Sequence, residues 1–168
     1  MATLNWENDM DTLLPVAERV GAKLKARKET IAIAESSGGG LISATLLAVP
    51  GASAYFLAGS VVYTVQAREG IVGITREQME GKRSSSEPYA QLLAASVRDK
   101  VGATWGLAET GAAGPSGNRY GDPAGHTCVA VAGASETVLT YRTGSDDRAA
   151  NMRAFALKAL ETMDEILG

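Results

Sequence analysis

The sequence predicts a single-domain α/β protein, a layered sandwich with a central, mainly buried sheet and helices packed against it. Strand-like apolar runs alternate with segments of helical periodicity along the 168-residue chain, which is typical of this class. Alanine and glycine are plentiful while aromatic residues make up only 5%, which favours close packing of helices on a sheet. A chain of this length builds one core, so we expect one domain over residues 1–168.

The first half of the chain is expected to begin with a helix capped by Thr12, with Pro15 in its first turn, running to residue 27. A strand over residues 30–34 follows, and then a helix that stops at Pro50-Gly51. Residues 55–63 form a continuous apolar run rich in β-formers, which predicts a buried strand. A short helix is expected over residues 66–72.

In the second half, Ser86 and Pro88 mark the start of a helix whose apolar stripe continues to residue 101. Strands are expected over residues 105–110 and 127–132, separated by a long loop rich in glycine. A more exposed strand over residues 137–143 and a closing helix from Asp147 complete the alternation.

Composition excludes several classes of protein. The net charge of -3 provides no basic surface for nucleic acid or membrane, and no apolar run has the length of a membrane span. The single cysteine, Cys128, indicates a reducing compartment, so we expect a cytoplasmic protein. One cysteine and one histidine cannot build a closed zinc site, and we expect neither a metal nor a cofactor.

A strand, a glycine turn and a helix start follow one another over residues 31–47. Glycine permits a left-handed backbone and lets a ligand approach main-chain N–H groups, so such turns bind anions or a developing oxyanion. The turn has neither the Lys-Ser or Lys-Thr of a P-loop nor the acidic residue expected after a dinucleotide fingerprint. Either these residues only permit a tight turn or they contact a ligand, and we predict ligand contact for Ser36, Gly38, Gly39 and Gly40.

Six short segments occur in a specific order along the chain: Ala34-Glu35-Ser36 with its glycines, Pro50-Gly51-Ala52-Ser53-Ala54-Tyr55-Phe56, Gly59-Ser60-Val61-Val62-Tyr63, Ser86-Glu87, Thr110-Gly111-Ala112-Ala113-Gly114-Pro115 and Pro123-Ala124-Gly125. In this combination they resemble the C-terminal domain of the competence/damage-inducible protein CinA, the nicotinamide-nucleotide amidohydrolase family. The resemblance implies hydrolysis of the carboxamide of nicotinamide mononucleotide to nicotinate mononucleotide and ammonia, a step in NAD recycling. It also implies a homo-oligomer, with a dimer expected.

By position, the serine, tyrosine and lysine that the family is thought to use correspond to Ser53, Tyr63 and Arg68. A nucleophilic serine needs a group that takes its proton, and arginine keeps its own proton in proteins. Arg68 therefore cannot be the base, but its charge favours the phenolate of Tyr63, which would then deprotonate Ser53. Ser36 is a rival nucleophile, for which we favour a role in shaping the glycine turn.

Other positions also depart from the family pattern. The family's Ser-Cys-Thr-Gly-Gly is Ser-Ser-Gly-Gly-Gly at residues 36–40, its His-Gly-Ala-Val is Lys-Arg-Ser-Ser at 82–85, and its Lys-Pro-Val-Gly is Asp-Pro-Ala-Gly at 122–125. We expect the ligand to contact the small-residue loop at Gly111, Ala113 and Gly114, with Arg119 restoring the positive charge lost at position 122. The alternative to an amidohydrolase is a non-catalytic ligand-binding paralogue that has lost the family's base.

Overall fold

The computed structural model describes residues 10–168, so residues 1–9 of the expected domain lie outside the description. Five strands form one sheet in the order β2-β1-β3-β4-β5. Their bounds are β1 Ile31–Glu35, β2 Phe56–Val61, β3 Trp105–Ala112, β4 His126–Ala132 and β5 Thr137–Arg142. Strand β1 runs parallel to β2 and β3, whereas β4 is antiparallel to both β3 and β5. The predicted α/β class is confirmed.

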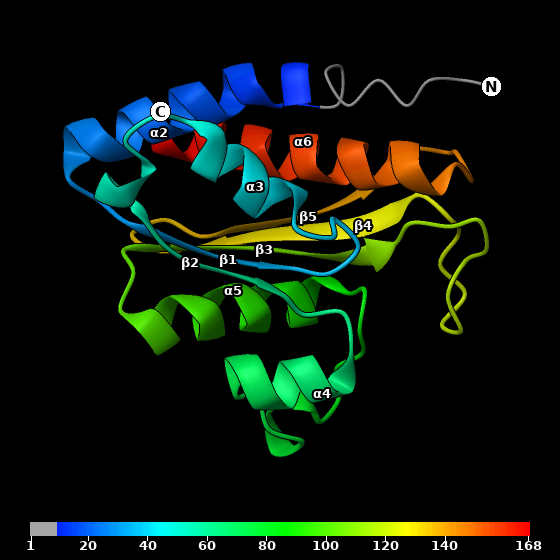
Figure 1. Ribbon diagram of the computed structural model, residues 1–168. Helices are drawn as coiled ribbons and strands as arrows, with labels where there is room; N and C mark the ends of the chain where they lie inside the picture. Colours follow the sequence, from blue (N-terminus) through cyan, green and yellow to red (C-terminus); the bar gives the residue numbers. More distant parts are fainter. Residues whose placement is uncertain (1–9) are drawn as a thin grey trace.

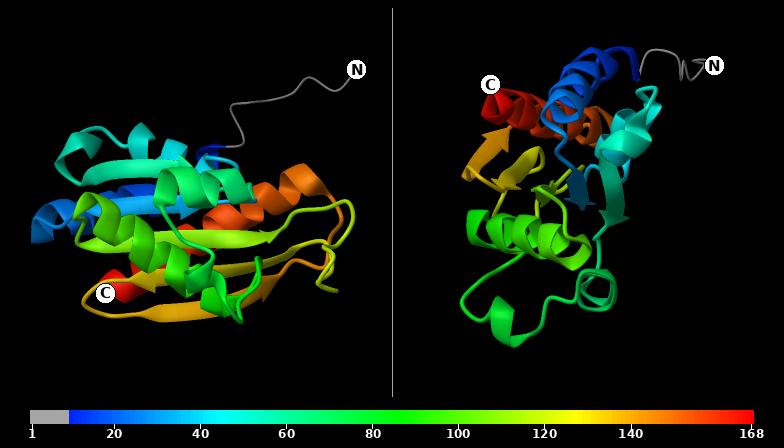
Figure 2. Two further views of the ribbon diagram at one scale, coloured as in Figure 1. Left: turned by 90° about the horizontal axis from the view of Figure 1, so that it is seen from below. Right: turned by 90° about the vertical axis from the view of Figure 1, so that its left-hand side faces the viewer.

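Helices cover both faces of this sheet (Figure 1). One face carries α2 (Leu14–Arg27), α3 (Leu41–Ala48) and α6 (Arg148–Leu167), and the other carries α5 (Glu87–Val101). The short helix α4 (Val65–Ala67) and the π-helical turn Arg68–Val72 lie beyond α5, as the end-on view of Figure 2 also shows. Short 3₁₀ turns occur at Ala52–Ala54 and Glu77–Met79. No helix in residues 10–168 is long and apolar enough to cross a membrane.

The predicted helix starts are correct for the last two long helices and wrong for the first. The Ser86 side chain accepts a hydrogen bond from the backbone of Tyr89, and Asp147 caps α6 in the same way through Ala150. Helix α2 instead begins after Leu13, with no side-chain cap from Thr12, although its first turn contains the expected proline.

Strand β1 separates two cores by alternating the size of its side chains. Ile31 and Ile33 point towards the α2, α3 and α6 layer, while Ala32 and Ala34 face α5. The small face allows α5 to approach closely: a Cβ added at Gly106 of β3 would lie 2.0 Å from a backbone oxygen of that helix. The abundance of small residues is therefore used to bring helix and sheet backbones together.

Residues 55–63 contain a strand, as predicted, but the prediction that this strand is buried is wrong. Strand β2 lies at the edge of the sheet and pairs only with β1. Its residues alternate between half-buried and exposed, with Leu57 and Val61 exposed. A continuous apolar run does not distinguish a central strand from an edge strand, because pairing on the second side depends on the topology.

Candidate active site

The first buried carboxylate under the glycine turn belongs to Glu35, the last residue of β1. It accepts hydrogen bonds from the backbone N–H groups of Gly40, Ile42 and Ser43 at 2.8, 3.1 and 2.9 Å, and from the Ser43 hydroxyl at 2.9 Å. These donors include the first N–H groups of α3, which a helix leaves without intrahelical partners. An internal carboxylate therefore occupies the helix N-terminus that the sequence suggested for a bound anion.

The second carboxylate, Glu109, comes from β3 and lies opposite Glu35 in the sheet register. It accepts hydrogen bonds from the N–H groups of Ser36 at 3.1 Å and Gly38 at 2.8 Å, and from the Thr127 hydroxyl at 2.7 Å. A Cβ at Gly38 would lie 2.9 Å from a Glu35 oxygen and 3.3 Å from a Glu109 oxygen. Glycine is required at this position because the backbone passes directly against both carboxylates.

Burial governs the proton affinity of this pair. Desolvation raises the pKa of Glu109 to about 7, against the hydrogen bonds from Thr127, Gly38 and Ser36, and the charge of Glu35 adds to the rise. Desolvation also raises the pKa of Glu35, although its hydrogen bonds from Ser43, Ile42 and Gly40 oppose the change. The two adjacent carboxylates under the turn therefore bind a proton more readily near neutral pH than exposed carboxylates do.

The prediction that Gly38, Gly39 and Gly40 present their N–H groups to a ligand is wrong. Gly38 and Gly40 donate to the two carboxylates, and Gly39 donates to the carbonyl of Ser36. None of the three glycines lines the cavities described below, whereas Ser36 does. The glycines instead shape the turn that places Ser36 at the end of β1.

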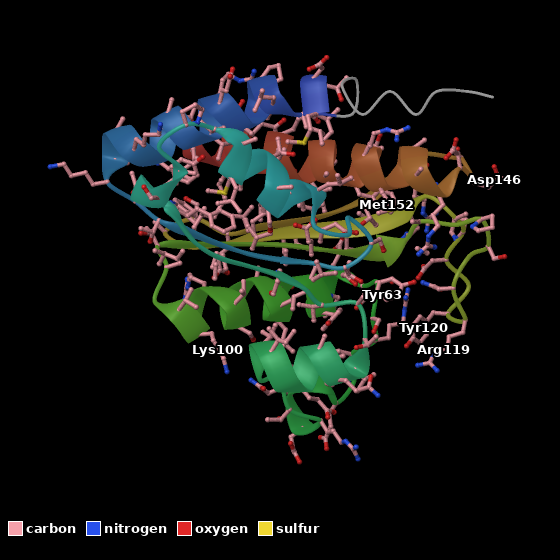
Figure 3. All side chains as sticks on the ribbon, viewed as in Figure 1. Tyr63, Lys100, Arg119, Tyr120, Asp146 and Met152 are labelled. Carbon is pink, nitrogen blue, oxygen red and sulfur yellow. The ribbon has the colours of Figure 1, made fainter. Side chains whose placement is uncertain are left out.

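A cavity of about 400 Å³ opens where β1 and β3 end. Ser36 lines it directly after β1, Thr110 and Gly111 line it from β3, and Tyr63 and Arg68 line it from the segment after β2. The rest of the wall comes from the start of α5 and the two loops beside it, including Ser84, Ser85, Tyr89, Asn118, Arg119 and Tyr120. Figure 3 shows Tyr63, Arg119 and Tyr120 together at this end of the molecule, with Lys100 at the opposite end of α5.

A smaller cavity of about 190 Å³ continues from the first and shares Tyr63, Gly111 and Asn118 with it. Its wall contains the predicted loop residues Ala113 and Gly114, together with Ser37, Ser116, Gly117 and Arg148. Arg148, the first residue of α6, donates to the Tyr63 hydroxyl at 3.2 Å and to the carbonyl oxygen of Gly114. The two cavities form one cleft, which we call the strand-end cleft.

Ser53 does not reach the strand-end cleft. It lies in the 3₁₀ turn before β2, and β2 runs parallel to β1 with Phe56 opposite Ile31 and Val61 opposite Glu35. Ser53 is therefore near the beginning of β1, while Ser36 follows its end. At about 3.3 Å per residue, the length of β1 separates them by roughly 15 Å. The prediction that Ser53 joins Tyr63 and Arg68 is wrong, because the intervening strand carries the chain away from the cleft.

The polar residues of the cleft wall that sequence reasoning missed include Thr110, Asn118 and Arg148. Thr110 stands out in the sequence only as the first residue of a small-residue motif, although its hydroxyl accepts a hydrogen bond from the backbone N–H of Ser85 at 3.2 Å beside the cavity. Arg148 lies 85 residues after Tyr63, so no local pattern could connect them. A signal was available for Glu109, because a carboxylate in the middle of a strand predicted to be buried requires internal donors.

Comparisons with known proteins agree with one another. A family model described as the CinA C-terminal domain matches residues 13–167. A CinA-like protein of Desulfosudis oleivorans is 39% identical over 158 residues, which is 91% of this chain and 37% of that protein. One from Anaeromyxobacter sp. strain K is 41% identical over 146 residues, 87% of this chain and 36% of its own length. The chain therefore spans little more than a third of these relatives.

Solved structures show the same fold. The CinA superfamily protein from Enterobacter cloacae superposes with a TM-score of 0.86 at 26% identity, covering 93% of this chain and 92% of that one. The competence or damage-inducible protein from Enterobacter asburiae superposes with a TM-score of 0.86 at 27% identity, covering 93% of this chain and 98% of that one.

Proposed function

The chain belongs to the CinA C-terminal domain family, and on this premise we propose that it hydrolyses the carboxamide of nicotinamide mononucleotide, or of a related small amide, to the acid and ammonia. The observation that carries the proposal is the meeting of Ser36, Tyr63 and Arg68 on one cavity. Ser36 follows β1, whereas Tyr63 and Arg68 follow β2, and the three side chains offer a nucleophile, a phenol and a fixed positive charge around one space. The tyrosines and arginines of the wall suit a flat ring attached to a phosphate.

In this proposal Ser36 takes the place that the sequence suggested for Ser53. The Ser36 oxygen attacks the amide carbon, and Tyr63 in its phenolate form accepts the serine proton. Arg148 donates a hydrogen bond to the Tyr63 oxygen at 3.2 Å, which holds the phenol beside the cleft. The carbon–nitrogen bond then breaks, and ammonia leaves with a proton returned by Tyr63. Water hydrolyses the resulting ester, which releases the acid and restores the Ser36 hydroxyl.

Charge that develops on the carbonyl oxygen needs donors in the cleft, since the N–H groups of Gly38 and Gly40 are engaged. Thr110 and Arg68 line the same cavity as Ser36. The Thr110 oxygen already accepts from Ser85, so its own proton is available to a ligand. We assign stabilisation of the oxyanion to these two side chains.

A second candidate function is binding without catalysis. It is favoured by Arg68, because a guanidinium cannot cycle the proton that the family's lysine is thought to carry. In that case the strand-end cleft binds the nucleotide, and no bond is broken.

Release of ammonia from nicotinamide mononucleotide tests the proposal, with Ser36→Ala and Ser53→Ala as matched variants. Ser36→Ala should lower turnover about a hundredfold or more, because the nucleophile is lost. Ser53→Ala makes the same chemical change at an exposed position near the other end of β1 and should leave turnover unchanged. Equal rates for wild type and Ser36→Ala would refute the assigned nucleophile. Nucleotide binding without ammonia release would favour the non-catalytic function.

A further inference from the structure

Within residues 10–168, the strand-end cleft contains three arginines and no acidic side chain. Arg68 and Arg119 line the larger cavity and Arg148 the smaller one, and neither lining includes an aspartate or a glutamate from this part of the chain. Among residues 10–168, no carboxylate forms a salt bridge within 4.0 Å with any of these three guanidinium groups. The cleft therefore has more positive charge than a single phosphate monoester, of charge near -2, neutralises.

Arg68 has the least satisfied environment of the three. Its guanidinium carbon lies 5.9 Å from the centre of the Tyr89 ring, which supports one face of the group. Its Nε atom is buried and has no hydrogen-bond partner within the part of the chain that the structure describes. A buried donor without an acceptor costs free energy, and a ligand that supplies an acceptor recovers that cost. The guanidinium edge also matches the two oxygens of a carboxylate.

Arg148 and Arg68 lie in different halves of the cleft, with Tyr63 shared between the two cavities. Arg148 lies beside the small residues Gly114, Ser116 and Gly117, where a phosphate can approach the backbone. Arg68 lies in the larger cavity together with Ser36, where the ring substituent of the substrate would be attacked. The positions of the charges thus favour a ligand with one anionic group at each end.

We propose that Arg68 forms a second anion subsite, so that the cleft binds a pyridine nucleotide with a ring carboxylate more tightly than the matching carboxamide. This inference rests on the proposed function, because it takes the nucleotide as the ligand of the cleft. A neutral carboxamide leaves the guanidinium charge uncompensated, whereas a carboxylate both neutralises it and accepts from its edge. The chain is then a receptor for the acid form of the nucleotide as well as a hydrolase for the amide form.

Calorimetric titration with nicotinate mononucleotide and with nicotinamide mononucleotide tests this subsite, with the full chain carrying Ser36→Ala so that the amide is not hydrolysed during the titration. We expect the acid to bind about tenfold more tightly, the gain from one charge-assisted pair of about 1.4 kcal/mol. Arg68→Gln should remove that preference by weakening the binding of the acid about tenfold and the binding of the amide less than threefold. Arg68→Lys loses the fork but can still pair with the bound carboxylate as an ammonium group, and should retain part of the preference.

Arg76→Gln is the matched control, since Arg76 is 86% exposed and does not line either cavity. It should change neither affinity. Equal affinities when Arg68 is present, or a preference that survives Arg68→Gln, would overturn the subsite and leave the hydrolase proposal standing. A preference for the acid without any release of ammonia from the amide supports the subsite and refutes hydrolysis. Failure of the wild type to bind either nucleotide at millimolar concentration overturns both proposals.

Discussion

Arg83 and Asp122, 39 residues apart in the chain, form a two-point ion pair beside the strand-end cleft. Nη1 of Arg83 lies 2.6 Å from Oδ2 of Asp122, and Nη2 of Arg83 lies 3.1 Å from Oδ1 of Asp122. Both residues belong to segments in which the sequence departs from the family pattern, and the structure shows that the two changes meet. Asp122 also accepts from the Asn118 side chain at 2.8 Å, so the pair ties two walls of the cleft together.

A double-mutant cycle with Arg83→Met and Asp122→Asn should detect this coupling. Asp122 is 9% exposed and Arg83 is 39% exposed, so solvent screens only part of the interaction. We expect each single variant to lower the free energy of unfolding by about 1–2 kcal/mol, with a coupling of about 1 kcal/mol. Chemical denaturation measures both quantities. Strictly additive losses would show that the two side chains do not stabilise one another.

The buried carboxylate of Glu109 predicts that the free energy of unfolding depends on pH. Replacing Glu109 with neutral glutamine should remove this dependence. The pKa of Glu109 in the folded protein is about 7, above the ordinary 4.5, so the folded state binds the proton more tightly. This contribution to stability is complete below about pH 4.5 and is lost as the pH rises towards 7. Glu109→Gln, whose amide can still accept from Ser36 and Gly38 and donate to Thr127, should lack that decline.

Urea denaturation of wild type and Glu109→Gln at pH values from about 5 to about 8 makes the comparison. Glu35 is the other ionisable group beside Glu109, and it remains in both proteins. The difference in stability between the two proteins should therefore change with pH in the interval assigned to Glu109. Parallel stability curves would contradict a raised pKa at this position.

The order of elements could be predicted because each one has a local signal. Ser86 with Pro88 and Asp147 mark helix starts by capping chemistry that acts within four residues. The edge position of β2 could not be predicted, because it depends on which strand pairs with β1 on its other side. The sequence shows that this run is hydrophobic, but it does not show whether one strand or two pair with it.

The predicted residues that line the strand-end cleft come from strand ends and from the segments that follow them. Ser36, Tyr63 and Gly111 come at strand ends, and parallel strands bring such ends to one edge of the sheet. Ser53 was misplaced because it precedes β2 whereas Tyr63 follows it, so the extended strand holds the two residues at its opposite ends. Arg148 was missed because its contact with Tyr63 is made entirely by the tertiary fold.

Gly106→Ala should destabilise the protein through the close contact between β3 and α5. The added Cβ would lie 2.0 Å from the carbonyl oxygen of Ala94, and a helix backbone cannot move away without losing core contacts. Overpacking of this kind costs about 1–3 kcal/mol or more. Gly70→Ala is the control, since a Cβ there has nothing within 4 Å, and its thermal midpoint should stay the same or rise slightly. Equal midpoints for the two variants would argue against the tight helix–sheet contact.

Arg68→Lys separates the two candidate functions. A lysine in this cavity, desolvated and next to other cations, can release its proton near neutral pH, whereas the arginine keeps its proton. If the cleft retains the geometry of a hydrolase, the variant should release ammonia from nicotinamide mononucleotide faster than the wild type, and we expect a gain on the order of a hundredfold. Adding Ser36→Ala should remove the gain, because the restored base then has no nucleophile to activate. Adding Ser53→Ala should leave the gain intact.

An unchanged rate in Arg68→Lys, with the wild type already active, would assign the base to Tyr63 alone. Inactivity of both proteins, with nucleotide binding preserved, would show that the cleft is a receptor and that its chemistry was lost by more than the change at position 68.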